Sequence, residues 1–227
     1  MIRFEVVTLD GPGGVGKSTA GKSVAARLGF YFLSTGQIYR ALTWMATRRG
    51  WKPGEALPGG FLEDARIEVL AEGGLRVNGE HPGEALFTDE ISHATSVLSA
   101  MPEVRELSNR VQRATVKGIE DSGQYSGVVL EGRDMGTVVF PDARHKFFLT
   151  AKPEVRALRR YDELKHRDPS LKLEEVAESL NARDHRDSKR ETAPLKADRD
   201  AITVDTSGMA FEDVVELLAD KIQATAG

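Results

Sequence analysis

The sequence of 227 residues contains no cysteine, which excludes disulfide bonds and thiolate metal sites and fits a reducing cytoplasm. It also lacks an excess of positive charge: 31 basic and 35 acidic residues give a net charge of −4, which argues against a nucleic-acid or membrane surface. No apolar run approaches the roughly 18 residues of a membrane span, and no signal segment precedes the first apolar stretch. The five histidines follow no metal-ligand spacing. We therefore expect a cytoplasmic protein without nucleic-acid or membrane partners.

Short apolar runs alternate with helical patterns along most of the chain. The apolar runs cover residues 4–9, 30–33, 128–130, 146–150 and 201–205. The helical patterns cover about residues 17–28, 36–49, 103–120, 153–166, 173–190 and 210–224. This alternation predicts an α/β fold in which helices flank a central five-stranded parallel sheet. In such a sheet, ligands bind beyond the C-terminal ends of the strands.

Residues 61–100 interrupt the alternation. Two short β patterns, Ile67–Leu70 and Leu75–Val77, lie on either side of a Gly73-Gly74 turn. The dipeptide Asn78-Gly79 is typical of a tight turn, and a helical pattern follows near 88–100. We interpret 61–100 as an inserted subdomain that covers a substrate, with 1–60 and 101–227 as the core domain. A plain surface excursion is the alternative.

Gly11–Ser18 match the phosphate-binding loop pattern G-x-x-x-x-G-K-[ST] in full. The match lies between a predicted strand and a predicted helix, which is its expected context. Backbone N–H groups of the loop and the positive end of the helix would cradle phosphates. Lys17 would reach the β- and γ-phosphates, and the Ser18 hydroxyl would hold Mg²⁺. The loop predicts a bound nucleoside triphosphate but does not specify the reaction.

Three further polar clusters carry candidate chemistry. Residues 34–40 and 131–137 follow predicted strands, so they lie at the same edge of the sheet as the phosphate loop, although either could be a solvated loop. In the third cluster, 183–190, Arg183, Asp187 and Arg190 share one helical face. The alternatives for this third cluster are a salt-bridged helix surface and a mobile lid, 183–194, that delivers arginines to a transferring phosphoryl group.

Other phosphate-loop classes match poorly. A GTP switch needs an Asn-Lys-x-Asp motif after a strand, and the nearest segment, Lys196-Ala197-Asp198, comes before a strand. A transport ATPase needs a Ser-Gly-Gly-Gln signature, which the sequence lacks. A small kinase with a lid and an acceptor subdomain remains.

The motifs resemble those of bacterial cytidylate kinases. The resemblance is carried in order by Gly11–Thr19, by Ser34–Arg40, by the run Gly132-Arg-Asp-Met-Gly-Thr-Val-Val-Phe-Pro-Asp-Ala143, and by Arg183–Arg190 continuing into Ala193-Pro194-Leu195. It covers essentially the whole chain, and the run at 132–143 is its most specific part. The long insertion near 61–100 also resembles the nucleoside-monophosphate-binding subdomain of the bacterial type.

The resemblance implies transfer of the γ-phosphoryl group from ATP to CMP or dCMP, with Mg²⁺ as cofactor. It implies ATP contacts from Gly11, Pro12, Gly13, Gly14, Val15, Gly16, Lys17, Ser18, Thr19, Arg156 and Arg160. It implies CMP contacts from Thr35, Arg40, Ser96, Arg105, Arg133, Asp134, Arg183, Asp187 and Arg190. Among these, Arg40, Arg133 and Arg190 would hold the acceptor phosphate, and Ser96, Arg105 and Asp134 would read the cytosine. Catalytic roles would belong to Lys17, Arg133, Arg160, Arg183 and Arg190.

Two positions depart from the family pattern. Glu131 stands where the family often has Asp, and this acid would organise Mg²⁺ through water. Gln37 stands where the family often has Ala and could add a hydrogen bond to the acceptor. Arg159, between Arg156 and Arg160, is expected to point elsewhere.

We expect the protein to be a monomer. The alternatives to a cytidylate kinase are another small-molecule kinase and a nucleotide switch with little phosphotransfer.

Overall fold

The computed structural model describes residues 4–70, 73–166 and 168–224. The chain divides into two compact units, which are described separately. The first comprises Met1–Phe32 and Tyr125–Gly227, and the second comprises Leu33–Gln124. Within the described residues, no helix is long and apolar enough to span a membrane.

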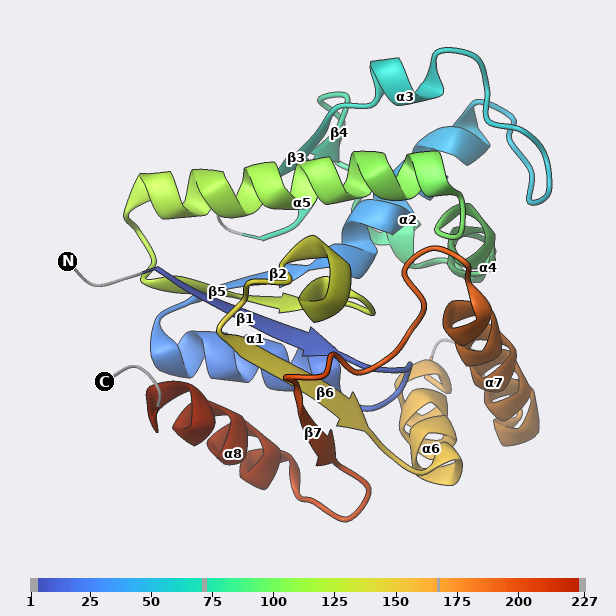
Figure 1. The fold of residues 1–227 in the computed structure, drawn as a ribbon. Coiled ribbons are helices and arrows are strands. Elements are labelled where there is room, and N and C mark those ends of the chain that lie inside the picture. Colours follow the sequence, from blue (N-terminus) through green and yellow to red (C-terminus); the bar gives the residue numbers. More distant parts are fainter. Residues whose placement is uncertain (1–3, 71–72, 167, 225–227) are drawn as a thin grey trace. The chain divides into compact units, whose positions relative to one another are not determined.

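The first unit is built on a five-stranded sheet with the order β2-β5-β1-β6-β7 (Figure 1). Its strands are β1 (Glu5–Asp10), β2 (Tyr31–Ser34), β5 (Gly127–Glu131), β6 (His145–Thr150) and β7 (Ile202–Asp205). β2 runs across the boundary between the units. β1 pairs in parallel with β5 and β6, and β6 pairs in parallel with β7. The predicted five-stranded sheet is confirmed, and β1 at its centre leads directly into the phosphate loop.

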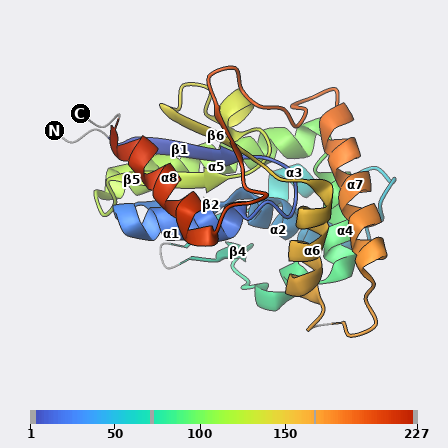
Figure 2. The ribbon, with the colours of Figure 1, turned by 90° about the horizontal axis from the view of Figure 1, so that it is seen from below.

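Helices α1 (Lys17–Leu28) and α8 (Phe211–Ala224) pack on one face of this sheet, as Figure 2 shows. The core between them contains Leu9 of β1, Val24 of α1 and Leu218 of α8, none of which is exposed to solvent. Burying one such side chain contributes about 1.5–3 kcal/mol. This packing fixes the end of β1 and the start of α1, which flank the loop.

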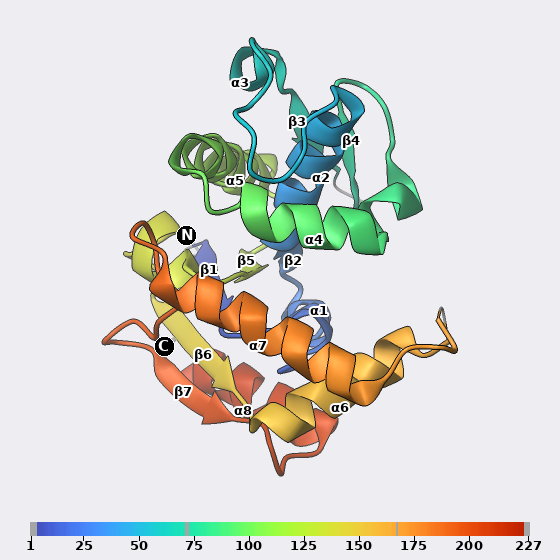
Figure 3. The ribbon, with the colours of Figure 1, turned by 90° about the vertical axis from the view of Figure 1, so that its right-hand side faces the viewer.

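Three further helical segments belong to the described part of the first unit. A short π-helix, η2 (Met135–Val139), packs against β1. Helices α6 (Pro153–Leu164) and α7 (Leu173–Lys189) lie side by side (Figure 3). The predicted helix at 173–190 is confirmed and ends one residue early, at Lys189, because Arg190 has an extended ψ of 137°.

The second unit consists mainly of helices around a small hairpin. Its elements are α2 (Thr35–Arg48), α3 (Phe61–Asp64), β3 (Ile67–Val69), β4 (Leu75–Val77), the 3₁₀ helix η1 (Gly83–Phe87), α4 (Asp89–Leu98) and α5 (Pro102–Ser122). β3 and β4 pair antiparallel. Asn78 and Gly79 have positive φ angles of 50° and 85°, as the tight turn predicted there requires.

The second unit, Leu33–Gln124, includes more of the chain than the subdomain predicted from the sequence, which covered residues 61–100. α2 packs against α4, β4 and η1, and α5 packs against α3 and β3, so both flanking helices belong to the same compact unit. Buried Leu42 and Leu98 show that α2 and α4 each place an apolar face in its interior. The role of 61–100 as a cover for a nucleotide stays a prediction.

Candidate active site

The phosphate loop fits closely against its neighbours, and two of its glycines are required sterically. A Cβ atom on Gly11, which has a φ of 143°, would lie 2.1 Å from the carbonyl oxygen of Leu149 in β6. A Cβ atom on Gly14, which has a φ of 75°, would lie 2.7 Å from the carbonyl oxygen of Arg156 in α6. Both positions combine a left-handed backbone with close backbone contact, so only glycine fits. The loop is therefore held in one shape by β6 and α6.

The loop ends in a helix that favours anions. Gly16 precedes α1 with a φ of 89°, and the first turn of α1 has no acidic residue and no side-chain cap. Ser18 and Thr19 in this turn are exposed. The N–H groups and the dipole of a helix start stabilise negative charge. The predicted phosphate cradle therefore has the required local geometry.

Lys17 is buried at the centre of the loop. Its Nζ donates hydrogen bonds to the carbonyl oxygens of Gly11 at 2.8 Å and Pro12 at 2.6 Å. The pKa of Lys17 is lowered from 10.5 to about 7, mainly by burial and also by Arg133 and Arg183, while Glu131 and Asp10 act in the opposite direction. This crowding of positive charge around a buried lysine creates a strong preference for an anion, because an anion would restore the charged form.

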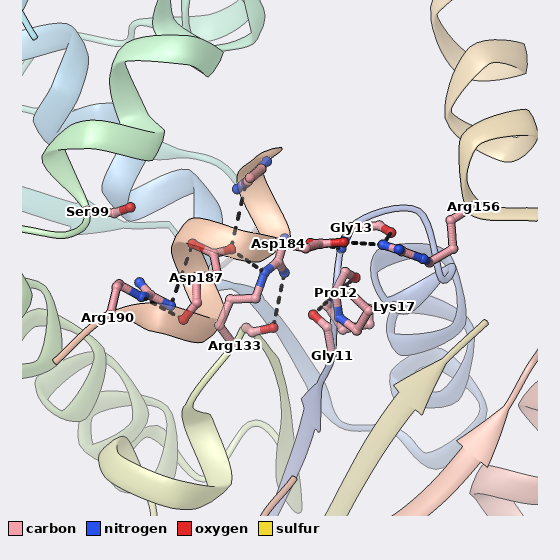
Figure 4. A network of polar contacts seen from close by, with 12 residues as sticks. Gly11, Pro12, Gly13, Lys17, Ser99, Arg133, Arg156, Asp184, Asp187 and Arg190 are labelled. Carbon is pink, nitrogen blue, oxygen red and sulfur yellow. Dashed lines mark hydrogen bonds and ion pairs between the residues drawn. The ribbon is translucent and has the colours of Figure 1, made fainter. Parts of the chain in front are cut away.

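Arg156 ties the phosphate loop to both neighbouring helices. Its Nη1 donates to the carbonyl oxygen of Gly13 at 3.2 Å and to the carboxylate of Asp184 in α7 (Figure 4). The same carboxylate accepts the N–H of Gly13 at 3.3 Å. Arg156 therefore lies at the loop, as predicted for the donor side. Asp184 was not among the predicted site residues.

Arg159 also reaches the loop, so the expectation that it points elsewhere is wrong. Its guanidinium donates to Thr206 Oγ1 at 2.9 Å, to the Thr206 carbonyl oxygen at 2.7 Å and to the Val15 carbonyl oxygen at 3.5 Å. Positions three apart on a helix share a face, so Arg159 follows Arg156. Arg160, which was predicted for the donor side, instead forms an ion pair with Glu163 of its own helix at 2.8 Å.

A cluster of arginines surrounds Asp187 on α7. Asp187 Oδ2 lies 3.1 Å from Arg133 Nε and 4.0 Å from Arg183 Nε, and its Oδ1 lies 3.7 Å from Arg190 Nη2. Figure 4 shows Arg133 and Arg190 converging on this one carboxylate. Asp187 and the side chain of Arg190 are buried, so the surface-only interpretation of 183–190 does not hold for them. One carboxylate with three arginines leaves a positive excess suited to phosphate groups.

Three buried acids lie near the loop: Asp10 at the end of β1, Glu131 at the end of β5, and Asp134 in the next turn. Asp10 accepts the N–H groups of Met135 and Gly136, at 2.9 and 2.8 Å. The pKa of Asp10 is raised from 3.8 to about 6, mainly by burial and also by Asp134, while the two N–H bonds and Lys17 act in the opposite direction. Sequence reasoning missed Asp10, although an acid that ends an apolar strand before the phosphate loop is a visible signal.

The donor set fits a magnesium ion that arrives with a nucleotide. Among the described residues, no group of three histidine, aspartate or glutamate side chains could hold a metal by itself. Mg²⁺ commonly takes one or two protein oxygens, and it obtains the rest from phosphates and water. The exposed Ser18 hydroxyl and the Glu131 carboxylate, which acts electrostatically on Lys17, are oxygens of this kind.

The second unit holds the other predicted acceptor residues. Arg40 in α2 donates to the Leu86 carbonyl oxygen and to Ser92 Oγ, both at 2.8 Å. Arg105 in α5 is buried, donates to the Ser99 carbonyl oxygen at 3.0 Å, and places its guanidinium 5.6 Å from the Tyr39 ring centroid. Thr35 and Ser96 are buried too. Buried polar side chains of this kind, in one small unit, are suited to recognising a polar ligand.

The loop, the sheet and the arginines together define a phosphate-loop kinase. The family model for cytidylate kinase matches residues 7–224, and the chain belongs to the cytidylate kinase family. A cytidylate kinase of Caldanaerobacter subterraneus is 42% identical over 226 residues, which cover 98% of this chain and 97% of the relative. That of Geobacter sulfurreducens is 39% identical over 230 residues, with 98% and 96% covered. An unliganded sugar kinase of a Janibacter species, 14% identical with a TM-score of 0.50, covers 98% of this chain and 96% of its own and resembles the fold alone.

Proposed function

We propose that this protein transfers the γ-phosphoryl group of Mg·ATP to CMP and dCMP, giving ADP with CDP or dCDP. The observation that carries the proposal is the cluster of arginines around the buried Asp187 and Lys17, in a chain that the cytidylate kinase family matches over nearly its whole length. The proposal places the reaction in cytoplasmic pyrimidine nucleotide metabolism and the protein in a monomeric state.

The reaction needs positioning and charge neutralisation more than acid–base chemistry. An oxygen of the CMP phosphate forms a bond to the γ-phosphorus as the bond between that phosphorus and the ADP oxygen breaks. Charge then spreads over the three transferring oxygens. Lys17 and Arg133 would stabilise this charge, with Arg183 and Arg190 of the cluster. When bound, Mg²⁺ would neutralise further phosphate charge.

Donor residues would act as the loop geometry suggests. The backbone N–H groups that Gly11–Thr19 offer, which Pro12 lacks, would bind the ATP phosphates, and Arg156 would brace the loop through the Gly13 carbonyl. Ser18 would ligate Mg²⁺ directly, and Glu131 would do so through water. Arg160 could serve ATP only after leaving Glu163, an exposed partner whose loss costs at most about 1 kcal/mol.

For the acceptor, we propose that Arg40, Arg133 and Arg190 bind the CMP phosphate and that Arg183 and Asp187 contact the ribose. Ser96, Arg105 and Asp134 would bind the cytosine. Cytosine offers an amine donor and two acceptors, which a carboxylate, a guanidinium and a hydroxyl complement. A buried site built on such bonds rejects a base that leaves them unpaired.

The base-reading role can be tested with Arg105→Met and Ser96→Ala. Each change removes a buried polar partner, so we expect the KM for CMP to rise by about 10–100-fold and the preference for CMP over UMP to fall. ATP affinity, measured without acceptor, should not change. Arg110→Met on the same helix changes an exposed guanidinium and is the matched control. An unchanged CMP-to-UMP ratio in both variants would remove these residues from the base site.

A further inference from the structure

Asp10 occupies a special place in the sheet. It is the last residue of β1 and directly precedes Gly11, the first residue of the phosphate loop. Side chains alternate along a strand, so Thr8 and Asp10 point to the face opposite the core residue Leu9. Only 5% of Asp10 is exposed. A buried carboxylate at this place needs bonding partners, because an uncompensated buried charge is costly.

The partners of Asp10 are two successive backbone N–H groups. Oδ1 accepts from Met135 at 2.9 Å and Oδ2 accepts from Gly136 at 2.8 Å, and both bonds are buried. Met135 and Gly136 are the first two residues of η2. Bonds from N–H groups to a carboxylate are stronger than bonds between neutral groups. Asp10 therefore fastens the start of η2 to the end of β1.

Gly136 makes this close approach possible. A Cβ atom at Gly136 would lie 2.9 Å from Thr8 Oγ1 and 3.3 Å from the Lys146 side chain. The backbone of η2 therefore lies directly on β1, with no room for a side chain between them. A side chain at this position would have to displace either Thr8 Oγ1 or the η2 backbone, which carries the N–H group that Asp10 Oδ2 accepts.

The fastened residues immediately follow Arg133 and Asp134. We propose that Asp10 is a positioning residue: by holding Met135 and Gly136 it sets Arg133 relative to the phosphate loop for phosphoryl transfer. The end of β1 is then connected to two parts of the site. The phosphate loop follows it in the chain, and the segment that contains Arg133 is attached to it by the hydrogen bonds of the Asp10 carboxylate. This inference rests on the proposed function, because Arg133 must act on a phosphate.

The bonding of Asp10 favours positioning over proton transfer. Both oxygens already accept hydrogen bonds from backbone donors, and Asp10 is buried. With a pKa of about 6, the group is ionised at neutral pH, the state that accepts both bonds. The charged groups that act on the Asp10 carboxylate are Lys17 of α1 and Asp134, the residue directly before η2.

Asp10→Asn is the first test. An asparagine side chain has one acceptor oxygen, so its NH₂ group would face one of the two N–H donors and that bond would be lost. A misplacement of a catalytic arginine by about 1 Å costs about 100-fold in rate, which is the expected fall in kcat. ATP affinity without acceptor should be retained. Asp168→Asn is the matched control, because Asp168 also accepts a backbone N–H, that of Ser170, but on the exposed surface.

A double-mutant cycle tests whether Asp10 acts through Arg133. If it does, Asp10→Asn should lower kcat far less in an Arg133→Ala background than in the wild type. Independent, multiplicative losses would overturn the proposal. So would a loss of ATP affinity as large as the loss of kcat, because Asp10 would then shape the phosphate loop itself.

A second route keeps the proposal falsifiable if Asp10→Asn does not fold. Gly136→Ala pushes the same N–H away from Oδ2 and leaves the carboxylate in place, so it should also lower kcat with ATP affinity retained. Adding Thr8→Ala removes the hydroxyl that the new methyl group meets, so the double variant should recover turnover. No loss in Gly136→Ala would overturn the proposal. Failure of the proposed function is distinct, since wild-type protein would then fail to phosphorylate CMP.

Discussion

The charge state of Lys17 yields a measurable consequence of nucleotide binding. Lys17 is 5% exposed, and its pKa is lowered from 10.5 to about 7 in the absence of nucleotide. Burial is the main cause of this decrease, and Arg133 and Arg183 contribute to it. The phosphates of ATP would oppose all three effects by placing negative charge beside the ammonium group. Binding should therefore raise the pKa of Lys17 back toward its ordinary value.

The size of the effect follows from the two pKa values. At pH 8, a group with a pKa of about 7 carries about a tenth of its full charge. If binding restores a pKa near 10.5, each ATP bound should take up about 0.9 proton at this pH. By linkage, ATP affinity should fall by about tenfold per pH unit between pH 8 and 10. The difference in pKa corresponds to about 5 kcal/mol between the two protonation states.

The assay is calorimetric titration of ATP, without acceptor, in buffers of equal pH and different ionisation enthalpy. The slope of the observed heat against the buffer enthalpy gives the number of protons. Lys17→Met should abolish the uptake. Lys22→Met changes an exposed lysine of the same helix and should preserve it. Zero uptake in the wild type at pH 8, or the same uptake in Lys17→Met, would refute the reasoning.

Three further outcomes are expected. Arg190→Ala should lower turnover by about 10³-fold and leave ATP binding intact, because the charge that Arg190 neutralises develops on the transferring phosphoryl group. Steady-state kinetics measure this loss, and an unchanged turnover number would exclude Arg190 from the site. Leu218→Ala, in the core beneath the sheet, should reduce the free energy of unfolding by about 2–5 kcal/mol in urea melts, and a change below about 1 kcal/mol would contradict the packing described. Chelation by EDTA should abolish turnover and excess Mg²⁺ should restore it, whereas full activity in EDTA would rule out the magnesium requirement.

The fold was largely predictable because its signals are local. The apolar runs gave the five strands, and glycine turns and helical spacing gave the helix ends to within one or two residues. The Gly11–Ser18 pattern specified a loop whose shape Gly11 and Gly14 now explain sterically. The extent of the second unit was less predictable, since it depends on the packing of α2 and α5 with segments distant in sequence.

The site residues were predictable from the sequence where a motif or helical spacing identifies them. They were less predictable where contacts between distant parts of the chain determine their position. The face shared by Arg183, Asp187 and Arg190 followed from helical spacing, and the structure places both arginines beside the Asp187 carboxylate. Arg159 and Asp10 were missed because their partners, Thr206 and the N–H groups of η2, lie far away along the chain. No local pattern reports such pairings.

The acceptor itself is the most direct test of the central claim. Purified protein should be assayed for ADP release from Mg·ATP with CMP, dCMP, UMP, AMP, GMP and shikimate as acceptors, with product identity checked by chromatography. The account predicts that CMP and dCMP are phosphorylated far faster than AMP, GMP or shikimate, and that CDP or dCDP forms in equal amount to ADP. Equal or faster turnover with AMP, or ADP release without a phosphorylated cytidine product, would contradict it.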